Sequence, residues 1–149
     1  MMERSIKSIF IILLLVMFSG CVGPPVRTYE GNKLPKSEVA VIKGWYVFYL
    51  LGVKDMYIYR IDDGYPEATK VEVLPGRHEL VIKDERGASL IYGGGSSRCA
   101  REAFNFEAGH EYKIKYLYKG IFEEGVKIID VTTGAMIFSQ PWSECGSGI

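Results

Sequence analysis

The chain has 149 residues, of which 48% are hydrophobic and 24% are charged, and its formal net charge is zero. This length favours one domain, and this apolar content is enough for a packed core, which excludes an intrinsically disordered chain. A neutral chain also lacks the basic surface that nucleic-acid phosphates require, so we expect no nucleic-acid partner. The 17 glycines and 10 tyrosines, together with short β-branched and aromatic runs, favour an all-β domain that is rich in turns.

The beginning of the chain has the pattern of a secretory signal peptide. Arg4 and Lys7 precede an apolar run over residues 9–18, which is too short to span a bilayer comfortably. This order predicts that residues 1–20 are a signal peptide and do not belong to the folded domain.

Phe18, Ser19, Gly20 and Cys21 complete this segment. A cysteine that follows small residues resembles the lipobox of bacterial lipoproteins, in which the cysteine is lipidated and becomes N-terminal after cleavage. The resemblance implies that Cys21 carries acyl chains, each buried CH₂ of which contributes about 0.8 kcal/mol to membrane binding. Val22 stands where an aspartate would retain such a protein at the inner membrane, so in a bacterium with two membranes the resemblance implies the outer membrane. The alternatives are an ordinary signal peptide near a cysteine and an N-terminal membrane anchor.

Cys99 and Cys145 remain once Cys21 is lipidated. An even number of cysteines in an oxidising compartment predicts a disulfide between them. The alternative is a pair of free thiols, or a reactive Cys99 whose thiolate is favoured by Arg98 and Arg101.

The mature chain divides into a tether and a domain. Residues 21–36 contain several prolines among polar residues and predict a stiff tether, and residues 37–149 predict the domain. Strands are expected at residues 38–42, 45–51, 56–61, 71–74, 78–83, 103–108, 110–119, 126–131 and 135–138. No helix is expected after the signal peptide, and the fold class is therefore a single small antiparallel β-sandwich.

The segment of residues 71–84 organises the domain. Its two strands flank Pro75 and Gly76, which predict a type II turn because proline presets the first turn position and glycine accepts a positive φ at the second. The second strand starts at His78, and a similar strand starts at His110.

Residues 61–64, with the turn at Pro75 and Gly76 and the alternating strand at residues 78–82, resemble the PEGA-type β-sandwich modules of bacterial envelope proteins. The similar stretch covers residues 56–83 and lacks the Thr-Pro and Gly-Tyr pairs usual in that family. The resemblance implies a β-sandwich in the cell envelope and provides no catalytic residues. The chain thus resembles a small bacterial lipoprotein with a PEGA-like module.

The two histidines are the natural candidates for metal ligands, and each is followed by a glutamate. In a strand, however, successive side chains point to opposite faces, so Glu79 and Glu111 point away from His78 and His110. We expect histidines at the rim of the core that bond to the backbone, with no metal and no cofactor. No nucleophile has a base in a recognisable motif, so we expect no enzymatic activity.

The tyrosines give the most suggestive pattern. Tyr112, Tyr116 and Tyr118 share one face of a strand by the period of two and, with Trp45, form a candidate binding surface. The alternative is that these aromatic residues form the core and its rim.

These observations predict a non-enzymatic, lipid-anchored module of the cell envelope that binds another envelope protein through an aromatic face or a sheet edge. One alternative is a module that binds carbohydrate or peptidoglycan by tyrosine stacking. Another is a periplasmic inhibitor of a wall-degrading enzyme that uses the glycine-rich loop at residues 93–98.

Overall fold

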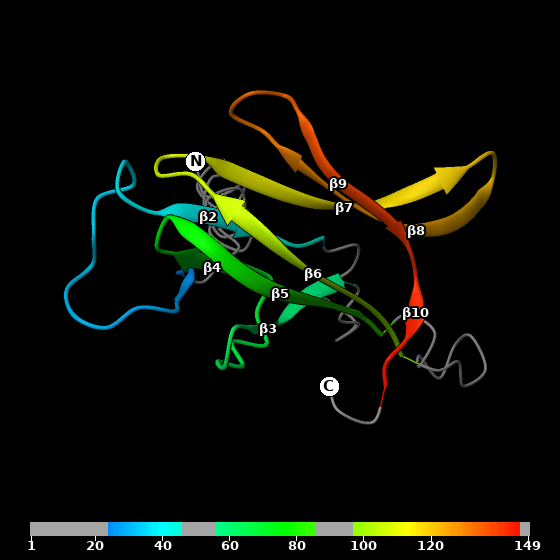
Figure 1. The fold of residues 1–149 in the computed structure, drawn as a ribbon, viewed down its shortest axis with the longest axis horizontal. Coiled ribbons are helices and arrows are strands. Elements are labelled where there is room, and N and C mark those ends of the chain that lie inside the picture. Colours follow the sequence, from blue (N-terminus) through cyan, green and yellow to red (C-terminus); the bar gives the residue numbers. More distant parts are fainter. Residues whose placement is uncertain (1–23, 46–55, 86–96, 147–149) are drawn as a thin grey trace, which may run out of the picture.

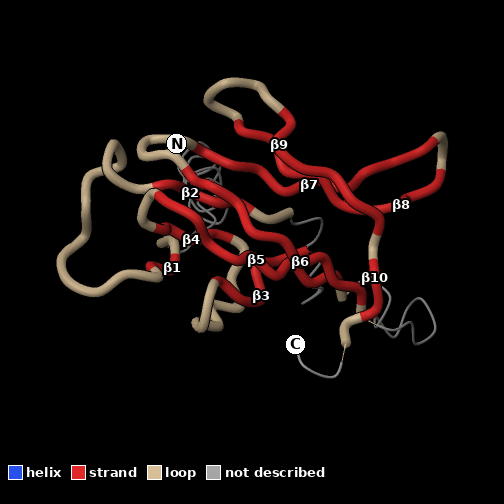
Figure 2. The backbone as a smooth tube through the Cα atoms, viewed as in Figure 1, coloured by secondary structure: helices blue, strands red, loops and turns tan. Residues whose placement is uncertain are grey.

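The computed structural model describes residues 24–45, 56–85 and 97–146, without the side chains of residues 122–124. This part of the chain consists of strands and connecting loops, with no helix (Figures 1 and 2). The all-β class predicted from the sequence is confirmed for these residues. The predicted signal peptide at residues 1–20, the predicted lipidation site Cys21, most of the glycine-rich loop and, apart from Trp45, the predicted strand at residues 45–51 lie outside them.

The strands form two sheets. In spatial order, the six-stranded sheet contains β1 (Val26–Arg27), β4 (Lys70–Val73), β2 (Ala40–Lys43), β7 (Glu111–Lys119), β8 (Phe122–Asp130) and β9 (Met136–Pro141). The four-stranded sheet contains β10 (Ser143–Glu144), β6 (Arg98–Phe106), β5 (Gly76–Asp84) and β3 (Met56–Ile61).

The core lies between the two sheets and is built from alternate residues of each strand. Fully buried members come from both sheets: Ala40, Ile42, Val71, Val73, Ile114, Val126 and Ile128 from the first, and Met56, Ile58, Leu80 and Ile82 from the second. Each such aliphatic side chain larger than alanine contributes roughly 1.5–3 kcal/mol when it leaves water. The two-sheet arrangement therefore agrees with the predicted sandwich.

The six-stranded sheet is mixed, so the prediction of a purely antiparallel sandwich was wrong. β1 pairs parallel with β4, and β2 pairs parallel with β7. The other pairs are antiparallel, including the β8–β9 hairpin that the sequence predicted. Parallel pairing joins strands that are distant in the sequence, so no local turn signal announces it.

The strands β4 and β5 belong to different sheets and do not form the tight turn expected at Pro75 and Gly76. The chain bends there and crosses from one sheet to the other, with Gly76 at a φ of 132°. Val71 and Val73 then face Leu80 and Ile82 across the core. Two strands with one apolar face each show the same alternating sequence pattern whether they form a hairpin within one sheet or lie in two facing sheets. The sequence pattern therefore could not distinguish a hairpin from this crossover.

The predicted tether is partly attached to the domain. β1 adds to the edge of the six-stranded sheet, and the Thr28 amide donates to the Glu72 carbonyl at 3.1 Å. The Tyr29 hydroxyl also donates to the carboxylate of Glu72, at 3.3 Å. Of the predicted tether at residues 21–36, the segment from Val26 to Tyr29 is thus attached to the domain.

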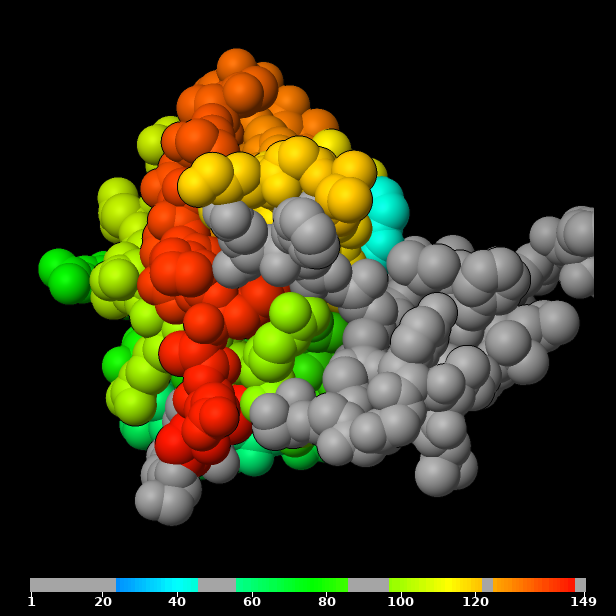
Figure 3. All heavy atoms as spheres, turned by 90° about the vertical axis from the view of Figure 1, so that its right-hand side faces the viewer, coloured from blue at the N-terminus to red at the C-terminus, as the bar shows by residue number. Residues whose placement is uncertain are grey.

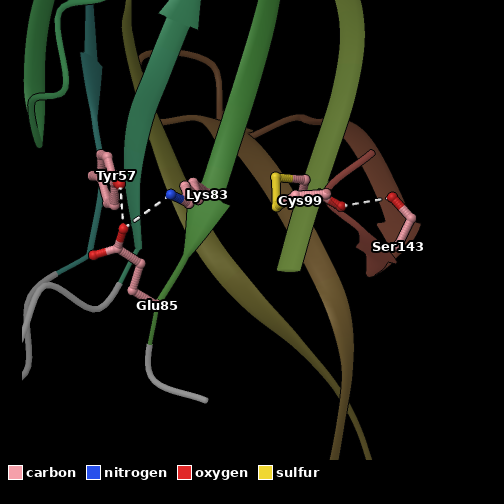
Figure 4. The surroundings of a disulfide bond; sticks show 6 residues. Tyr57, Lys83, Glu85, Cys99 and Ser143 are labelled. Carbon is pink, nitrogen blue, oxygen red and sulfur yellow. Dashed lines mark hydrogen bonds and ion pairs between the residues drawn. A yellow bond between two sulfur atoms is a disulfide. The ribbon is translucent and has the colours of Figure 1, made fainter. Parts of the chain in front are cut away.

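The disulfide between Cys99 and Cys145 is present and ties the end of the chain to β6. β10 pairs with the start of β6, and the Ser143 hydroxyl donates to the Cys99 carbonyl at 2.9 Å (Figure 4). On the neighbouring strands, Glu85 accepts hydrogen bonds from Tyr57 at 2.7 Å and from Lys83 at 3.1 Å (Figure 4). Burial, and then the hydrogen bond to Glu85, raises the pKa of Tyr57 above its ordinary value.

Replacing both Cys99 and Cys145 by alanine is expected to lower the free energy of unfolding by about 2–4 kcal/mol. The bond closes a loop with a sequence separation of 46 residues, and its loss gives that loop's freedom back to the unfolded chain. Urea unfolding with and without dithiothreitol measures the effect. Dithiothreitol should lower the unfolding free energy of the natural protein and leave that of the double variant unchanged. An equal decrease in both proteins would contradict the prediction.

Gly125 in β8 is expected to tolerate no side chain. A Cβ there would lie 2.0 Å from the Gln140 carbonyl oxygen of β9, so Gly125→Ala should push β9 away from β8. We expect the unfolding free energy of the variant to fall by about 1–3 kcal/mol. Gly146→Ala, where a Cβ meets nothing within 4 Å, is the control. Equal stability of the two variants would contradict this account.

Candidate functional site

The predicted aromatic surface does not exist as a surface. Tyr112 and Tyr116 are core residues with exposed fractions of 2% and 5%, and Trp45 is partly buried against the same core. Only Tyr118, at 56% exposure, is open to solvent. The period of two placed three tyrosines on one face correctly, but that face points inward until a bulge at residues 117–118 turns the strand.

Each buried tyrosine also satisfies its hydroxyl inside the protein. The Tyr112 hydroxyl accepts a hydrogen bond from the Glu107 amide at 2.9 Å, and its ring packs edge-on against Phe106. The Tyr116 hydroxyl donates across the core to the fully buried carboxylate of Asp84 at 3.3 Å, which links the two sheets. Arg98, the cross-strand neighbour of Asp84, forms an ion pair with the same carboxylate. These polar groups are therefore structural.

The first histidine bonds within the rim of the core. The Nδ1 atom of His78 lies 2.6 Å from Asp62, and its Nε2 atom lies 2.9 Å from the Leu74 carbonyl oxygen. Asp62 also accepts the Glu79 amide at 2.9 Å. His78 thereby connects the end of β3, the β4–β5 crossover and the start of β5. The carbonyl of Leu74 takes the position that a nucleophile would need for a catalytic histidine.

The second histidine repeats this arrangement on the other sheet. The Nδ1 atom of His110 lies 2.8 Å from Asp130, which ends β8, and its Nε2 atom lies 3.5 Å from Glu107. Asp130 also accepts the amides of Thr132 and Thr133, which shape the β8–β9 turn. In both copies, a histidine at a strand start is held by an aspartate at the end of the antiparallel neighbour. The two similar strand starts at His78 and His110 thus share the same kind of histidine–aspartate contact at a strand end.

The glutamates that follow the histidines point away from them, as the alternation predicted. Glu79 pairs with Arg60 at 2.5 Å and with Arg101 at 2.9 Å, and Glu111 pairs with Lys43 at 2.6 Å. Within residues 24–45, 56–85 and 97–146, no three or more histidine, cysteine, aspartate or glutamate side chains are placed to hold a metal ion.

An open cleft of about 500 Å³ lies beside β1. Its lining includes the exposed apolar side chains of Val26, Tyr65 and Leu74, together with Asp62 and His78. The last two already bond to each other, so they offer little to a polar ligand. The cleft is therefore a weaker candidate than the sheet edge.

The strongest candidate is the outer edge of β9, with which no described strand pairs. β9 is the last strand of the six-stranded sheet, and Figure 3 shows β9 and β10 as an orange-to-red ridge along the surface. Met136 and Ile137 are 59% and 38% exposed, while Phe138 packs inward against Phe104 with ring centroids 4.9 Å apart. Residues 131–143 contain no charged side chain.

Natural sheet edges are protected by charge, by shortness or by cover, because their free N–H and C=O groups bind other strands. Among the described edges, β1 and β10 have two residues each, and β3 is bridged through Met56 and Ile58 to the segments at Trp45 and Ala68. β10 covers only the first two residues of β6, and the uncovered part of β6 carries the charged side chains of Arg101 and Glu102. β9 has six residues, and its protections are Pro141 and a bulge at Ile137. The stretch from Phe138 to Gln140 remains an uncharged, regular edge.

The uncharged run over residues 131–143 is the one signal for this edge in the sequence. That run alone would equally suit a buried strand, and only the strand order shows that it ends a sheet.

No protein-family model, curated protein or solved structure matches this chain. In the part of the chain that the structure describes, no helix is both long enough and apolar enough to cross a bilayer.

Stability should fall in acid partly through Asp130. Burial alone would raise the pKa of this carboxyl group, but the hydrogen bonds from His110, Thr132 and Thr133 outweigh it, so the pKa lies below its ordinary value. A group whose pKa is lower in the folded state stabilises the fold above its unfolded-state pKa. That contribution should disappear as the pH falls below about 4 and passes through the folded-state pKa.

Asp130→Asn tests this pH dependence. The variant should lose about 1–3 kcal/mol at pH 7, because it lacks the charged acceptor, and should show a flatter decline of unfolding free energy in acid. Urea unfolding across the acidic range measures both. Asp63→Asn, at an exposed turn position, is the control and should change stability by less than about 0.5 kcal/mol. Parallel pH profiles of Asp130→Asn and the natural protein would refute the assignment.

Proposed function

We propose that this protein is a non-enzymatic, lipid-anchored module of the cell envelope that binds another envelope protein by pairing with the free edge of β9. The envelope context comes from the resemblance of residues 18–21 to a lipobox and of residues 56–83 to PEGA-type modules. In a bacterium with two membranes, the anchor would be in the outer membrane. The observation that carries the binding function is the exposed, uncharged edge of β9.

An edge strand recognises a partner by main-chain hydrogen bonds, with side chains on alternate positions adding specificity. Ile137 and Ser139 lie on the side of β9 opposite the inward-facing Phe138 and are exposed. A partner strand laid along β9 would therefore gain main-chain bonds and an apolar contact at Ile137, without having to desolvate a charge.

The glycan-binding alternative has lost its main support, since Tyr112 and Tyr116 are buried and offer no stacking surface. The inhibitor alternative depends on the loop at residues 93–98, of which the structure describes only Ser97 and Arg98.

Site-specific photocrosslinking in cells tests the proposal. A photoreactive residue at Ser139 of the full-length protein should capture one dominant envelope protein, identified by mass spectrometry. The same residue at Asn105, which is exposed on β6 of the other sheet, should capture much less of it. Capture of wall fragments in place of a protein would favour the glycan alternative.

Lysine on the edge should block the pairing. The double variant Ile137→Lys/Ser139→Lys is expected to reduce partner binding roughly tenfold, equivalent to about 1.4 kcal/mol, because a partner strand would have to desolvate the new charges. Asn105→Lys is the matched control and should bind normally. Unchanged binding by the double variant, with its fold intact by circular dichroism, would refute the β9 edge as the docking site.

A further inference from the structure

The outer face of the six-stranded sheet gathers five lysines, which we call the lysine face: Lys43, Lys70, Lys113, Lys115 and Lys127. The strand registers align Lys70 of β4, Lys43 of β2 and Lys113 of β7 in one row. In the next row, Lys115 of β7 lies directly opposite Lys127 of β8. The intervening residues of these strands point into the core, so all five side chains are on the outside.

The positive charge of this face is mostly unbalanced. Lys43 pairs with Glu111 at 2.6 Å, whereas the other four lysines have no ion pair among the described residues. Among the described side chains, the other acidic group of the face, Glu72, is 3% exposed and accepts a hydrogen bond from Tyr29. Like charges directly opposite on paired strands destabilise a sheet, so Lys115 and Lys127 do not serve the fold.

The outer face of the four-stranded sheet differs. There, Glu79 pairs with both Arg60 and Arg101, and Lys83 pairs with Glu85 at 3.1 Å. Arg60, Arg101 and Lys83 of that face thus have acidic partners, whereas four of the five lysines of the lysine face have none among the described residues.

The position of the anchor connects the lysine face with a membrane. β1 forms one edge of the same sheet, and its Arg27 aligns with Glu72 on the outer face. Residues 22–25 separate β1 from Cys21 and span at most about 18 Å when fully extended. A lipidated Cys21 would therefore hold this edge of the sheet close to the bilayer, where electrostatic attraction acts over about 10 Å.

We infer that the lysine face is the membrane-facing surface of the domain and contacts anionic phospholipid headgroups. The inference rests on the lipidated Cys21 of the proposed function. Headgroup phosphates would neutralise the lysines that lack partners and relieve the repulsion between Lys115 and Lys127. β9 lies at the edge opposite β1, and its main-chain edge groups point along the plane of the sheet, so a partner strand can still pair with them while the lysine face rests on the membrane. Ser139, the cross-strand neighbour of Lys127, projects on the same side as the lysine face.

Amine labelling of the full-length lipidated protein in vesicles tests the orientation. The protein is reconstituted in phosphatidylcholine vesicles with or without phosphatidylglycerol, acetylated with a water-soluble ester and mapped by mass spectrometry. Lys70, Lys113, Lys115 and Lys127 should react roughly fivefold more slowly on anionic vesicles, since each lysine near such a surface gains about fivefold in binding. Lys83, on the other sheet, is the internal reference and should react equally on both. Added salt should abolish the difference.

A pair of charge variants sharpens the test. Lys115→Gln/Lys127→Gln should remove most of the protection of Lys70 and Lys113, and it should keep its fold because it relieves a like-charge pair. Arg77→Gln/Arg101→Gln removes the same charge from exposed positions on the four-stranded sheet and should keep the protection.

Equal labelling on both vesicle types would overturn the inference, while capture at β9 would still decide the proposed function separately. Protection by soluble dextran sulfate, without protection by anionic vesicles, would assign the face to a polymer and also overturn it. A protein that floats with neither vesicle would refute the lipid anchor itself.

Discussion

The burial of one face of each sheet against the other is the constraint on which the whole structure depends. In the described part of the chain, the core residues come from these two inner faces, and the hydroxyl group of Tyr116 spans them to reach Asp84. Because the inner faces bury most of the described aliphatic and large aromatic residues, any binding function has to use outer faces, edges or loops. This constraint removes the aromatic surface as a candidate and directs attention to β9 and the lysine face.

The strand order then decides how these two features relate. β1 and β9 are the opposite edges of one sheet, and the lysine face lies between them. A domain held by its β1 edge would present β9 on the side away from the anchor. The two proposals are thus mutually consistent, although each depends on a different observation.

The histidines show how a repeated sequence serves a structural role. His78 with Asp62 and His110 with Asp130 each join a strand start to the end of its antiparallel neighbour, once in each sheet. The repeated strand pattern showed that the two segments were alike. It did not reveal the aspartates, since these come from elsewhere in the chain and approach only when the strands pair.

The sequence by itself determined the all-β class, most of the described strands, the two cysteines that pair and the alternation that turns Glu79 and Glu111 away from the histidines. These properties depend on near neighbours in the chain or on composition, where the period of two and the turn residues act directly. Only the tertiary structure decided which face of β7 is buried, that β4 and β5 belong to different sheets, that β1 joins a sheet, and that β9 ends one. These features depend on which strands pair across long separations, and the free energy of that pairing comes from the whole core, so no local pattern carries it.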